Sequence, residues 1–267
     1  MGEDLAALLG AYDAQLRAHV HEPLPDSICA ERDGPLLRTL GFGGRGMVEY
    51  RDLDGLDGAE LDELIARQVR TFTEREESVE WKLHGHDRPA DLPERLRVAG
   101  FVPEDMETVL IARVSAIGIE AGMPDGVVVR EVTEPLDLGR IAQLEEEIWA
   151  DDHGWVVDSL GKEQTADPDG LRIFIVEAGD AVVCAGWVRF PSGTEFGTLW
   201  GGGTLPAWRG RGIYRALVAH RARLAAERGR RYLEVDASDD SRPILERLGF
   251  VAVTTTTPYV WSPPAVA

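Results

Sequence analysis

The residues whose types and spacing best suit a chemical role lie in the segment TLPAWRGRGIYR, residues 204–215. Two arginines alternate with two glycines there, at Arg209, Gly210, Arg211 and Gly212. An apolar helical pattern begins directly after them. Glycines allow successive backbone N–H groups to face one concavity, and a helix N-terminus adds about half a positive charge. Each guanidinium group adds charge-assisted hydrogen bonds of roughly 1.5–3 kcal/mol. The segment therefore predicts a phosphate-binding site, with an exposed basic turn that binds nothing as the alternative.

Acidic residues near the ends of predicted strands are candidates for moving protons. Glu195 begins the strand before this loop, while Glu234 and Asp236 alternate in the next strand and so point to the same face. Carboxylates in such places can accept a proton, directly or through water. The alternative for each is a solvated sheet end or a structural ion pair. The run Glu145 to Glu147 is interpreted as a solvated helix face.

A third group of polar and aromatic residues follows the predicted helix 135–150. Asp152, His153 and Trp155, together with Asp151, offer carboxylates, an imidazole and an indole that can recognise a cationic amine. An ordinary polar helix end has the same composition, and that alternative stays open.

The remaining histidines and the cysteines do not predict a metal site. His220 falls on an apolar helical stripe and is interpreted as a core histidine, whereas His84 and His86 lack a third ligand. Cys29 and Cys184 show no metal-ligand spacing. A pair of cysteines without such spacing fits a reducing cytoplasm better than a disulfide scaffold.

Alternating strand and helix patterns position these candidates in the second half of the chain. Their order is β-α-(α)-β-β-β-α-β-α-β, which predicts an α/β fold with a mixed sheet and helices on its faces. Gly179 and Asp180 mark a short hairpin. The strands are expected at 127–132, 171–180, 181–190, 194–206, 232–238 and 250–261, and the main helices at 135–150, 212–228 and 241–249.

The first half of the chain ends in a weak echo of this pattern. Residues 79–101 repeat the strand, Arg-Pro turn, helix and Gly-Phe of residues 232–250. We infer an internal duplication, although a glycine after a helix is common in unrelated strand–turn–helix units. The predicted domains are 1–115 and 127–267, joined by a Gly- and Pro-containing linker at 116–126.

The second half resembles the GNAT superfamily of acyl-CoA-dependent N-acetyltransferases. The signature R/Q-x-x-G-x-G/A of that family is similar to Arg209 through Gly212 to Tyr214, where a tyrosine replaces the usual small residue. A strand followed by a short helix ending in Leu-Gly-Phe is similar to residues 232–250, and the likeness extends over 127–261. The first half is expected to be a degenerate copy of the same fold.

The resemblance implies where acetyl-CoA binds. Its pyrophosphate is expected on the loop and helix start, including Ile213 and Tyr214, and its pantetheine arm on backbone groups of Thr204 and Leu205. The arm lies between two splayed strands in this family. Residues Gly201 to Gly203 suit such a splay, because consecutive glycines permit a bulge, with a flexible turn as the alternative.

The resemblance also implies direct attack of a neutral amine on the thioester, without a covalent enzyme intermediate. Glu195 and Glu234 are candidate bases, and Ser241 is a candidate acid. Many relatives carry a tyrosine where this chain has Leu245, so Tyr232, Tyr259 or water are further candidates for the acid. His153 and its neighbours are expected to contact the acceptor.

The N-terminal copy is expected not to bind CoA. The equivalent helix start is DLDGLDG, residues 52–58, and carboxylates at a helix N-terminus repel a pyrophosphate. Its expected role is to complete the sheet or to wall the acceptor site.

Composition limits the classes of protein that fit. The 267 residues carry a formal charge of −19, which argues against a nucleic-acid binder, and no stretch approaches the roughly 18 apolar residues of a membrane helix. The N-terminus lacks the pattern of a secretory signal, and arginine outnumbers lysine as in high-GC bacteria. We therefore expect a cytoplasmic bacterial N-acetyltransferase, compatible with a homodimer, that acetylates an amine of a small molecule or protein. The alternative is an acyl-CoA-binding sensor without activity.

Overall fold

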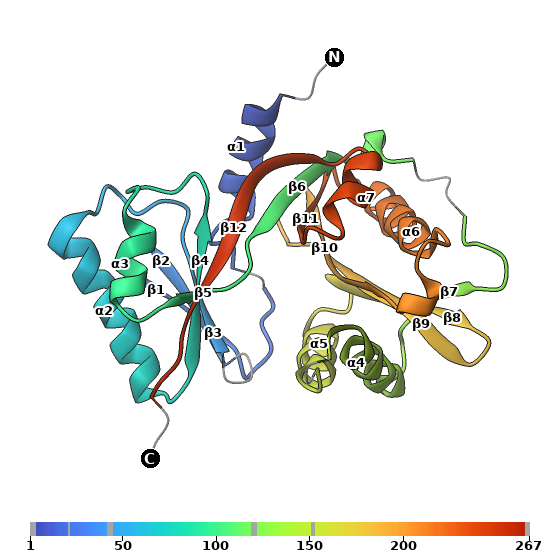
Figure 1. Ribbon diagram of the computed structural model, residues 1–267, viewed down its shortest axis with the longest axis horizontal. Helices are drawn as coiled ribbons and strands as arrows, with labels where there is room; N and C mark the ends of the chain where they lie inside the picture. The colour runs from blue at the N-terminus through green and yellow to red at the C-terminus, as the bar shows by residue number, and fades with distance from the viewer. Residues whose placement is uncertain (1–3, 21, 42–44, 119–121, 151–152, 265–267) are drawn as a thin grey trace. The chain divides into compact units, whose positions relative to one another are not determined.

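The computed structural model describes residues 4–20, 22–41, 45–118, 122–150 and 153–264. These residues form two compact units that divide the chain unevenly. The C-terminal unit is built mainly from Leu110–Ala252, and the N-terminal unit from residues 4–20, 26–109 and 253–264 (Figure 1). The last segment thus belongs with the first half of the chain, whereas the sequence-based limits assign it to 127–267.

The C-terminal unit is a mixed sheet with helices on both faces. Its strands lie in the order β6-β11-β10-β9-β8-β7. The predicted hairpin at Gly179 and Asp180 is confirmed, because Ala178 of β8 pairs with Ala181 of β9 across a two-residue turn. The elements are β6 (Glu107–Arg113), η1 (Val114–Ala116), β7 (Val128–Glu131), α4 (Pro135–Trp149), α5 (Trp155–Ala166), β8 (Leu171–Ala178), β9 (Ala181–Arg189), β10 (Phe196–Thr204), η2 (Pro206–Trp208), α6 (Ile213–Glu227), β11 (Tyr232–Ala237) and α7 (Arg242–Arg247).

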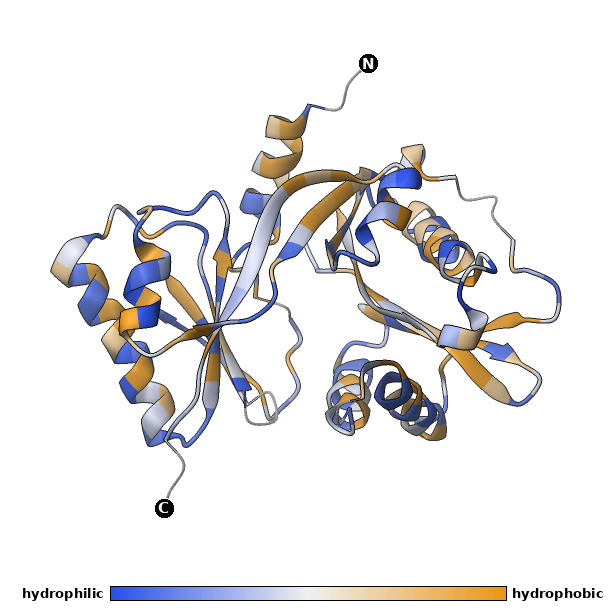
Figure 2. Cartoon of the chain, viewed as in Figure 1, coloured by the Kyte–Doolittle hydropathy of each residue, from blue (hydrophilic) through white to orange (hydrophobic). Residues whose placement is uncertain are grey.

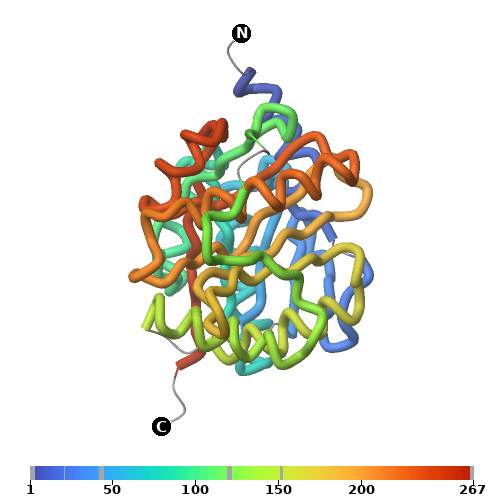
Figure 3. The backbone as a smooth tube through the Cα atoms, turned by 90° about the vertical axis from the view of Figure 1, so that its right-hand side faces the viewer, coloured from blue at the N-terminus to red at the C-terminus, as the bar shows by residue number. Residues whose placement is uncertain are grey.

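Two apolar layers hold this sheet between its helices. Leu138, Ile141 and Leu144 of α4 pack with α5 on one face, where Trp187 of β9 is also buried. Helix α6 covers the other face through residues such as Leu217, and the two helix layers are visible in Figures 1 and 3. Figure 2 shows the apolar bands that the helices turn toward the strands. This burial of one helix stripe is the pattern that the sequence predicted.

The N-terminal unit repeats the parallel strand pair followed by helices. Its sheet has the order β1-β2-β3-β4-β12, with β5 paired to β12. Of the apolar side chains at helical spacing in residues 61–72, Leu61, Leu64, Ile65 and Phe72 are buried and Val69 is partly buried. The elements are α1 (Leu5–Gln15), β1 (Cys29–Asp33), β2 (Leu36–Leu40), β3 (Arg45–Glu49), α2 (Gly58–Glu74), β4 (Ser78–His84), α3 (Leu92–Val98), β5 (Val102–Pro103) and β12 (Val251–Trp261).

Each unit contains a strand from the other half of the sequence. Strand β12 pairs antiparallel with β4, from Thr256 opposite His84 to Trp261 opposite Val79. Strand β6, at the end of the first half, lies beside β11 in the C-terminal unit. The alternation of β-branched residues in β12 predicts a strand but does not select its partner, which is why the sequence left this exchange open.

The exchange makes the stability of the N-terminal unit depend on the end of the chain. Tyr259 is buried opposite Trp81, so Tyr259→Ala should destabilise that unit by about 3 kcal/mol. Hydrogen exchange should show lost protection in β4 while β8 and β9 stay protected. Tyr232→Ala, which removes a buried tyrosine from β11, is the control and should affect the C-terminal unit instead. Lost protection in β8 and β9 alone after Tyr259→Ala would contradict the exchange.

Candidate active site

A β-bulge interrupts β10 at the predicted glycine triplet. Trp200 pairs with Trp187 of β9, but Gly203 pairs with Ala185, so β10 carries one extra residue. Gly201 and Gly202 have φ values of 65° and 96°, a region that L side chains rarely adopt. A Cβ atom at Gly201 would lie 2.2 Å from the ring of Trp187. The bulge therefore requires glycine for both conformation and space.

Strands β10 and β11 pair over a short length and then continue. Their parallel pairing runs from Phe196 opposite Tyr232 to Thr198 opposite Glu234, whereas β10 extends to Thr204. The bulge lies beyond the paired part. The end of the pairing before the bulge is compatible with the splayed strand pair that the resemblance implies.

The arginine–glycine loop follows directly, between η2 and α6. Gly210 and Gly212 have φ values of 73° and 82°, and Gly212 is the N-cap of α6. The side chains of Arg209 and Arg211 are exposed, and the first turn of α6 contains no acidic residue. Ile213 is buried and anchors the helix start in the core. The loop thus presents the N–H groups of a helix N-terminus and two cations without a carboxylate in that turn.

Both loop arginines already have partners within the chain. The Nε of Arg209 donates a 3.1 Å hydrogen bond to the carbonyl of Thr204, and the guanidinium of Arg211 lies 4.5 Å from the ring centroid of Trp208. The N–H of Leu205 donates to the carbonyl of Val183. A pantetheine arm that uses the Thr204 carbonyl would share it with Arg209 or displace that side chain.

The α6 side of the bulge is filled by polar side chains. The ring of Tyr214 lies 2.8 Å from the position of a Cβ at Gly202, and burial raises the pKa of its hydroxyl, so the phenol stays neutral. The hydroxyl of Thr204 donates to the Sγ of Cys184 at 3.2 Å. Burial raises the pKa of the Cys184 thiol to about 11, which leaves it protonated and unsuited to act as a nucleophile.

Arg221 of α6 connects the two strands at the bulge. Its side chain is buried, with 1% of the residue exposed, and its Nη1 donates to the carbonyls of Trp187 at 3.0 Å and Trp200 at 3.2 Å. Among the described residues it forms no ion pair. Burial lowers the pKa of Arg221. The guanidinium replaces strand hydrogen bonds where the register shifts, and so holds the bulge in place.

Glu145 of α4 lies on the opposite side of the bulge, which corrects its interpretation as part of a solvated face. Only 5% of the residue is exposed, and its Oε2 accepts a 2.9 Å hydrogen bond from Trp149. Its Oε1 is buried without a hydrogen-bond partner in the described part of the chain, 3.2 Å from the position of a Cβ at Gly203. Burial raises the pKa of Glu145, against smaller opposing effects of Trp149 and His153.

The periodicity of α4 contained the signal for Glu145. Leu138, Ile141, Leu144 and Ile148 form the apolar stripe of this helix, and Glu145 lies beside Leu144, four residues after Ile141 and three before Ile148. A carboxylate in an apolar stripe indicates burial, whereas the neighbouring Glu146 and Glu147 are exposed.

The three predicted catalytic residues lie in different places. Glu195 precedes β10, with its side chain 48% exposed and 3.5 Å from Arg231, about 20 Å of strand before the bulge. Glu234 of β11 is buried opposite Thr198 of β10, at the position where the pairing of these two strands ends. The hydroxyl of Ser241, just before α7, donates to the carbonyl of Ser238 at 3.2 Å. The structure does not bring these three residues together at the bulge.

The tyrosines considered as the general acid pack in other parts of the structure. Leu245 is fully buried in the core, Tyr232 packs on Phe196 with ring centroids 5.0 Å apart, and Tyr259 belongs to the N-terminal unit. Tyr214, which the sequence places at the expected pyrophosphate site, is the tyrosine that contacts the bulge.

The predicted acceptor-binding residues lie between α4 and α5. Asp152 is outside the described residues. The rings of His153 and Trp155 are 6.4 Å apart, and Trp155 is 58% exposed at the start of α5. His153 is near enough to Glu145 to influence its pKa. The structure therefore brings His153 together with a carboxylate that the sequence analysis did not select.

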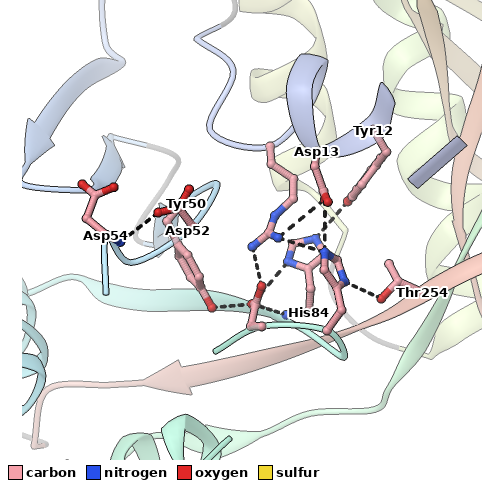
Figure 4. A network of polar contacts seen from close by, with 10 residues as sticks. Tyr12, Asp13, Tyr50, Asp52, Asp54, His84 and Thr254 are labelled. Carbon is pink, nitrogen blue, oxygen red and sulfur yellow. Dashed lines mark hydrogen bonds and ion pairs between the residues drawn. The ribbon is translucent and has the colours of Figure 1, made fainter. Parts of the chain in front are cut away.

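The N-terminal unit fills the equivalent strand ends with its own side chains (Figure 4). Asp87, after β4, accepts hydrogen bonds from Tyr50 at 2.5 Å and Arg17 at 2.7 Å, and the hydroxyl of Tyr12 lies 2.9 Å from His84 Nε2. Burial lowers the pKa of His84 to about 2, so its ring is neutral. The described residues contain no cluster of three or more metal-ligating side chains.

The helix start of this unit is acidic. The loop before α2 contains Asp52, Asp54 and Asp57, and Glu60 lies in the first turn of the helix. A cavity of about 550 Å³ is lined by this loop, α1 and residues 86–89. Carboxylates thus surround the start of α2, which disfavours a diphosphate at that helix N-terminus, although Arg17, Arg51 and Arg88 also line the cavity.

Comparisons with known proteins agree with the geometry. Residues 138–250 match the model of the acetyltransferase (GNAT) family. A GCN5-related N-acetyltransferase from Kribbella flavida superposes with a TM-score of 0.67 over 98% of this chain and 95% of that chain, at 15% identity. A tandem GNAT protein from the clavulanic acid biosynthesis pathway superposes with a TM-score of 0.60 over 98% and 96%, at 14% identity. No curated protein matches the sequence.

Residues 138–250 thus match the acetyltransferase (GNAT) family, a group whose fold serves acyl transfer. The whole chain has a fold shared with GNAT proteins, one of them a tandem GNAT protein. None of the helices described is long and apolar enough to cross a membrane.

The role of Arg221 in holding the bulge can be tested by substitution. Arg221→Met leaves the carbonyls of Trp187 and Trp200 without their buried donor, which costs about 1–3 kcal/mol per group. Amides of residues 200–203 should exchange at least tenfold faster, while α4 stays protected. Arg223→Met, on the same helix, is the control. Unchanged exchange at the bulge would show that the glycines alone maintain it.

Proposed function

We propose that the protein is an acetyl-CoA-dependent N-acetyltransferase whose working site lies in the C-terminal unit. The observation that carries the proposal is the Arg209–Gly212 loop at the start of α6, next to the bulge and the splayed end of β10. The diphosphate of acetyl-CoA binds the N–H groups and arginines of this loop. The pantetheine arm follows the opening between β10 and β11 and leads the thioester to Gly201–Gly203.

The reaction is direct transfer. A neutral primary amine attacks the thioester carbonyl, the new C–N bond forms, and the C–S bond breaks with its electron pair passing to the CoA sulfur. The nitrogen loses a proton to a base and the thiolate receives one from a phenol, a hydroxyl or water. The protonated, buried thiol of Cys184 supports a route without an acyl-enzyme.

The proposed protein works in the bacterial cytoplasm, as a monomer or homodimer. Cys29 and Cys184 are both free, which supports a reducing compartment. Its acceptor is an amine, and its net charge of −19 disfavours nucleic acid as a partner.

One observation favours a second candidate, a sensor that binds acyl-CoA without turnover. Leu245 is buried in the core at the position where many relatives carry a tyrosine. Such a module needs the diphosphate loop but no proton donor.

Calorimetry with coenzyme A tests the diphosphate site. Arg209→Ala should weaken binding about tenfold, or roughly 1.4 kcal/mol, because a charge-assisted donor is lost. Gly212→Asp should weaken it at least as much, because aspartate adds a negative charge at the N-cap and resists a φ of 82°. Asp57→Ala, at the N-cap of α2, is the control and should leave affinity unchanged. Equal affinities of all variants would place the diphosphate elsewhere.

Release of free thiol separates the enzyme from the sensor. Wild-type protein with acetyl-CoA and a panel of primary amines should release CoA thiol at a rate that depends on the amine. Tight CoA binding without amine-dependent release would support the sensor and refute the enzyme.

A further inference from the structure

We propose that Glu145 receives the proton of the acceptor amine, and that the acceptor is a primary amine carried on a flat apolar group. This inference rests on the proposed function and names its base and substrate class. It depends on the described contacts of Glu145 and on the exposed indoles of Trp149 and Trp155.

The first support is a carboxylate oxygen of Glu145 that has no hydrogen-bond partner among the described residues. Glu145 Oε1 is buried 3.2 Å from the Cβ position of Gly203, at the bulge to which the thioester is led. A buried carboxylate oxygen without a donor is unfavourable, because it has lost its hydrogen bonds to water. An N–H group of a bound amine would satisfy it and would stand next to the reacting carbonyl.

The second support is the difference between the two sides of the bulge. Tyr214 packs against Gly202 from α6, and Arg221 binds strand carbonyls from the same helix. On the α4 side, Gly203 leaves room for no more than a hydrogen atom between the backbone and Glu145 or Ile148. Among the side chains that closely approach Gly201–Gly203, Glu145 is the one that carries a carboxylate.

The third support concerns the substrate. Trp149 donates its Nε1 proton to Glu145, which fixes the indole beside the carboxylate, yet the residue is 52% exposed. Trp155, at the start of α5, is 58% exposed. The exposed indole of Trp149 beside the carboxylate, with that of Trp155 beside His153, favours an amine attached to an aromatic or other planar group, which stacks on an indole.

The charged and titratable groups that face Glu145 are few. His153 acts on it from the segment before α5, and Cys184 lies within electrostatic reach on β9. Glu145 must be ionised to accept a proton, and its burial raises its pKa. Activity should therefore fall as the pH decreases through a value above the usual range of a glutamate.

The proton balance is closed by the chain and water. The amine N–H proton passes to Oε1 as the C–N bond forms, and the electron pair of the C–S bond leaves on sulfur. The thiolate then takes the proton from the protonated Glu145, directly or through a water molecule. The products are an amide and CoA thiol, and the carboxylate is restored.

The test is the pH profile of kcat/KM with an arylamine acceptor, which is uncharged over the assayed range. Wild type should show an acid limb, and Glu145→Gln should lower kcat/KM at least a hundredfold and remove that limb. Coenzyme A affinity and thermal stability should be kept, because glutamine has the same shape and loses a buried charge. Glu147→Gln, an exposed neighbour with the same substitution, should behave as wild type.

Substrate class is tested on the same variants. Wild type should prefer arylalkylamines to alkyl polyamines at least tenfold, and Trp149→Ala should abolish that preference. Retention of the acid limb, or of activity within twofold, in Glu145→Gln would overturn the assignment of the base. Preference for polyamines would overturn the substrate class. Failure of wild type to bind CoA would instead refute the proposed function itself.

Discussion

A strand that leaves its regular register, and is held there, is the constraint on which the candidate site depends. In β10 the left-handed conformations of Gly201 and Gly202 make the bulge possible, and the buried guanidinium of Arg221 satisfies the carbonyls at that point. Without the bulge, β10 would continue its ladder, and Gly203 would not come next to Glu145. Backbone conformation, a buried cation and a buried carboxylate thus define one small region of the C-terminal unit.

The two units show how one fold is used with different electrostatics. Both contain a parallel strand pair followed by a loop and a helix, but the loop before α6 carries arginines and glycines, whereas the loop before α2 carries aspartates. In the N-terminal unit the strand ends are also filled by an ion pair between Arg17 and Asp87. This unit retains the fold and the strand exchange while its helix start disfavours anions.

Much of this arrangement could be predicted from the sequence, because local chemistry determines it. The glycines of the bulge and of the α6 N-cap, the hairpin at Gly179 and the apolar stripe of α2 depend on neighbouring residues. Two features could not be predicted in the same way. The pairing of β12 with β4 is a long-range choice that alternation does not encode, and the burial of Glu145 depends on which strand packs against α4. Both depend on tertiary contacts.

The most direct test of the account is a crystal structure of the protein with acetyl-CoA. The account predicts that the diphosphate accepts hydrogen bonds from backbone N–H groups within residues 210–214, and that the thioester lies at Gly201–Gly203 on the side of Glu145. A diphosphate bound at residues 51–57 of the N-terminal unit, or a thioester remote from the bulge, would contradict it.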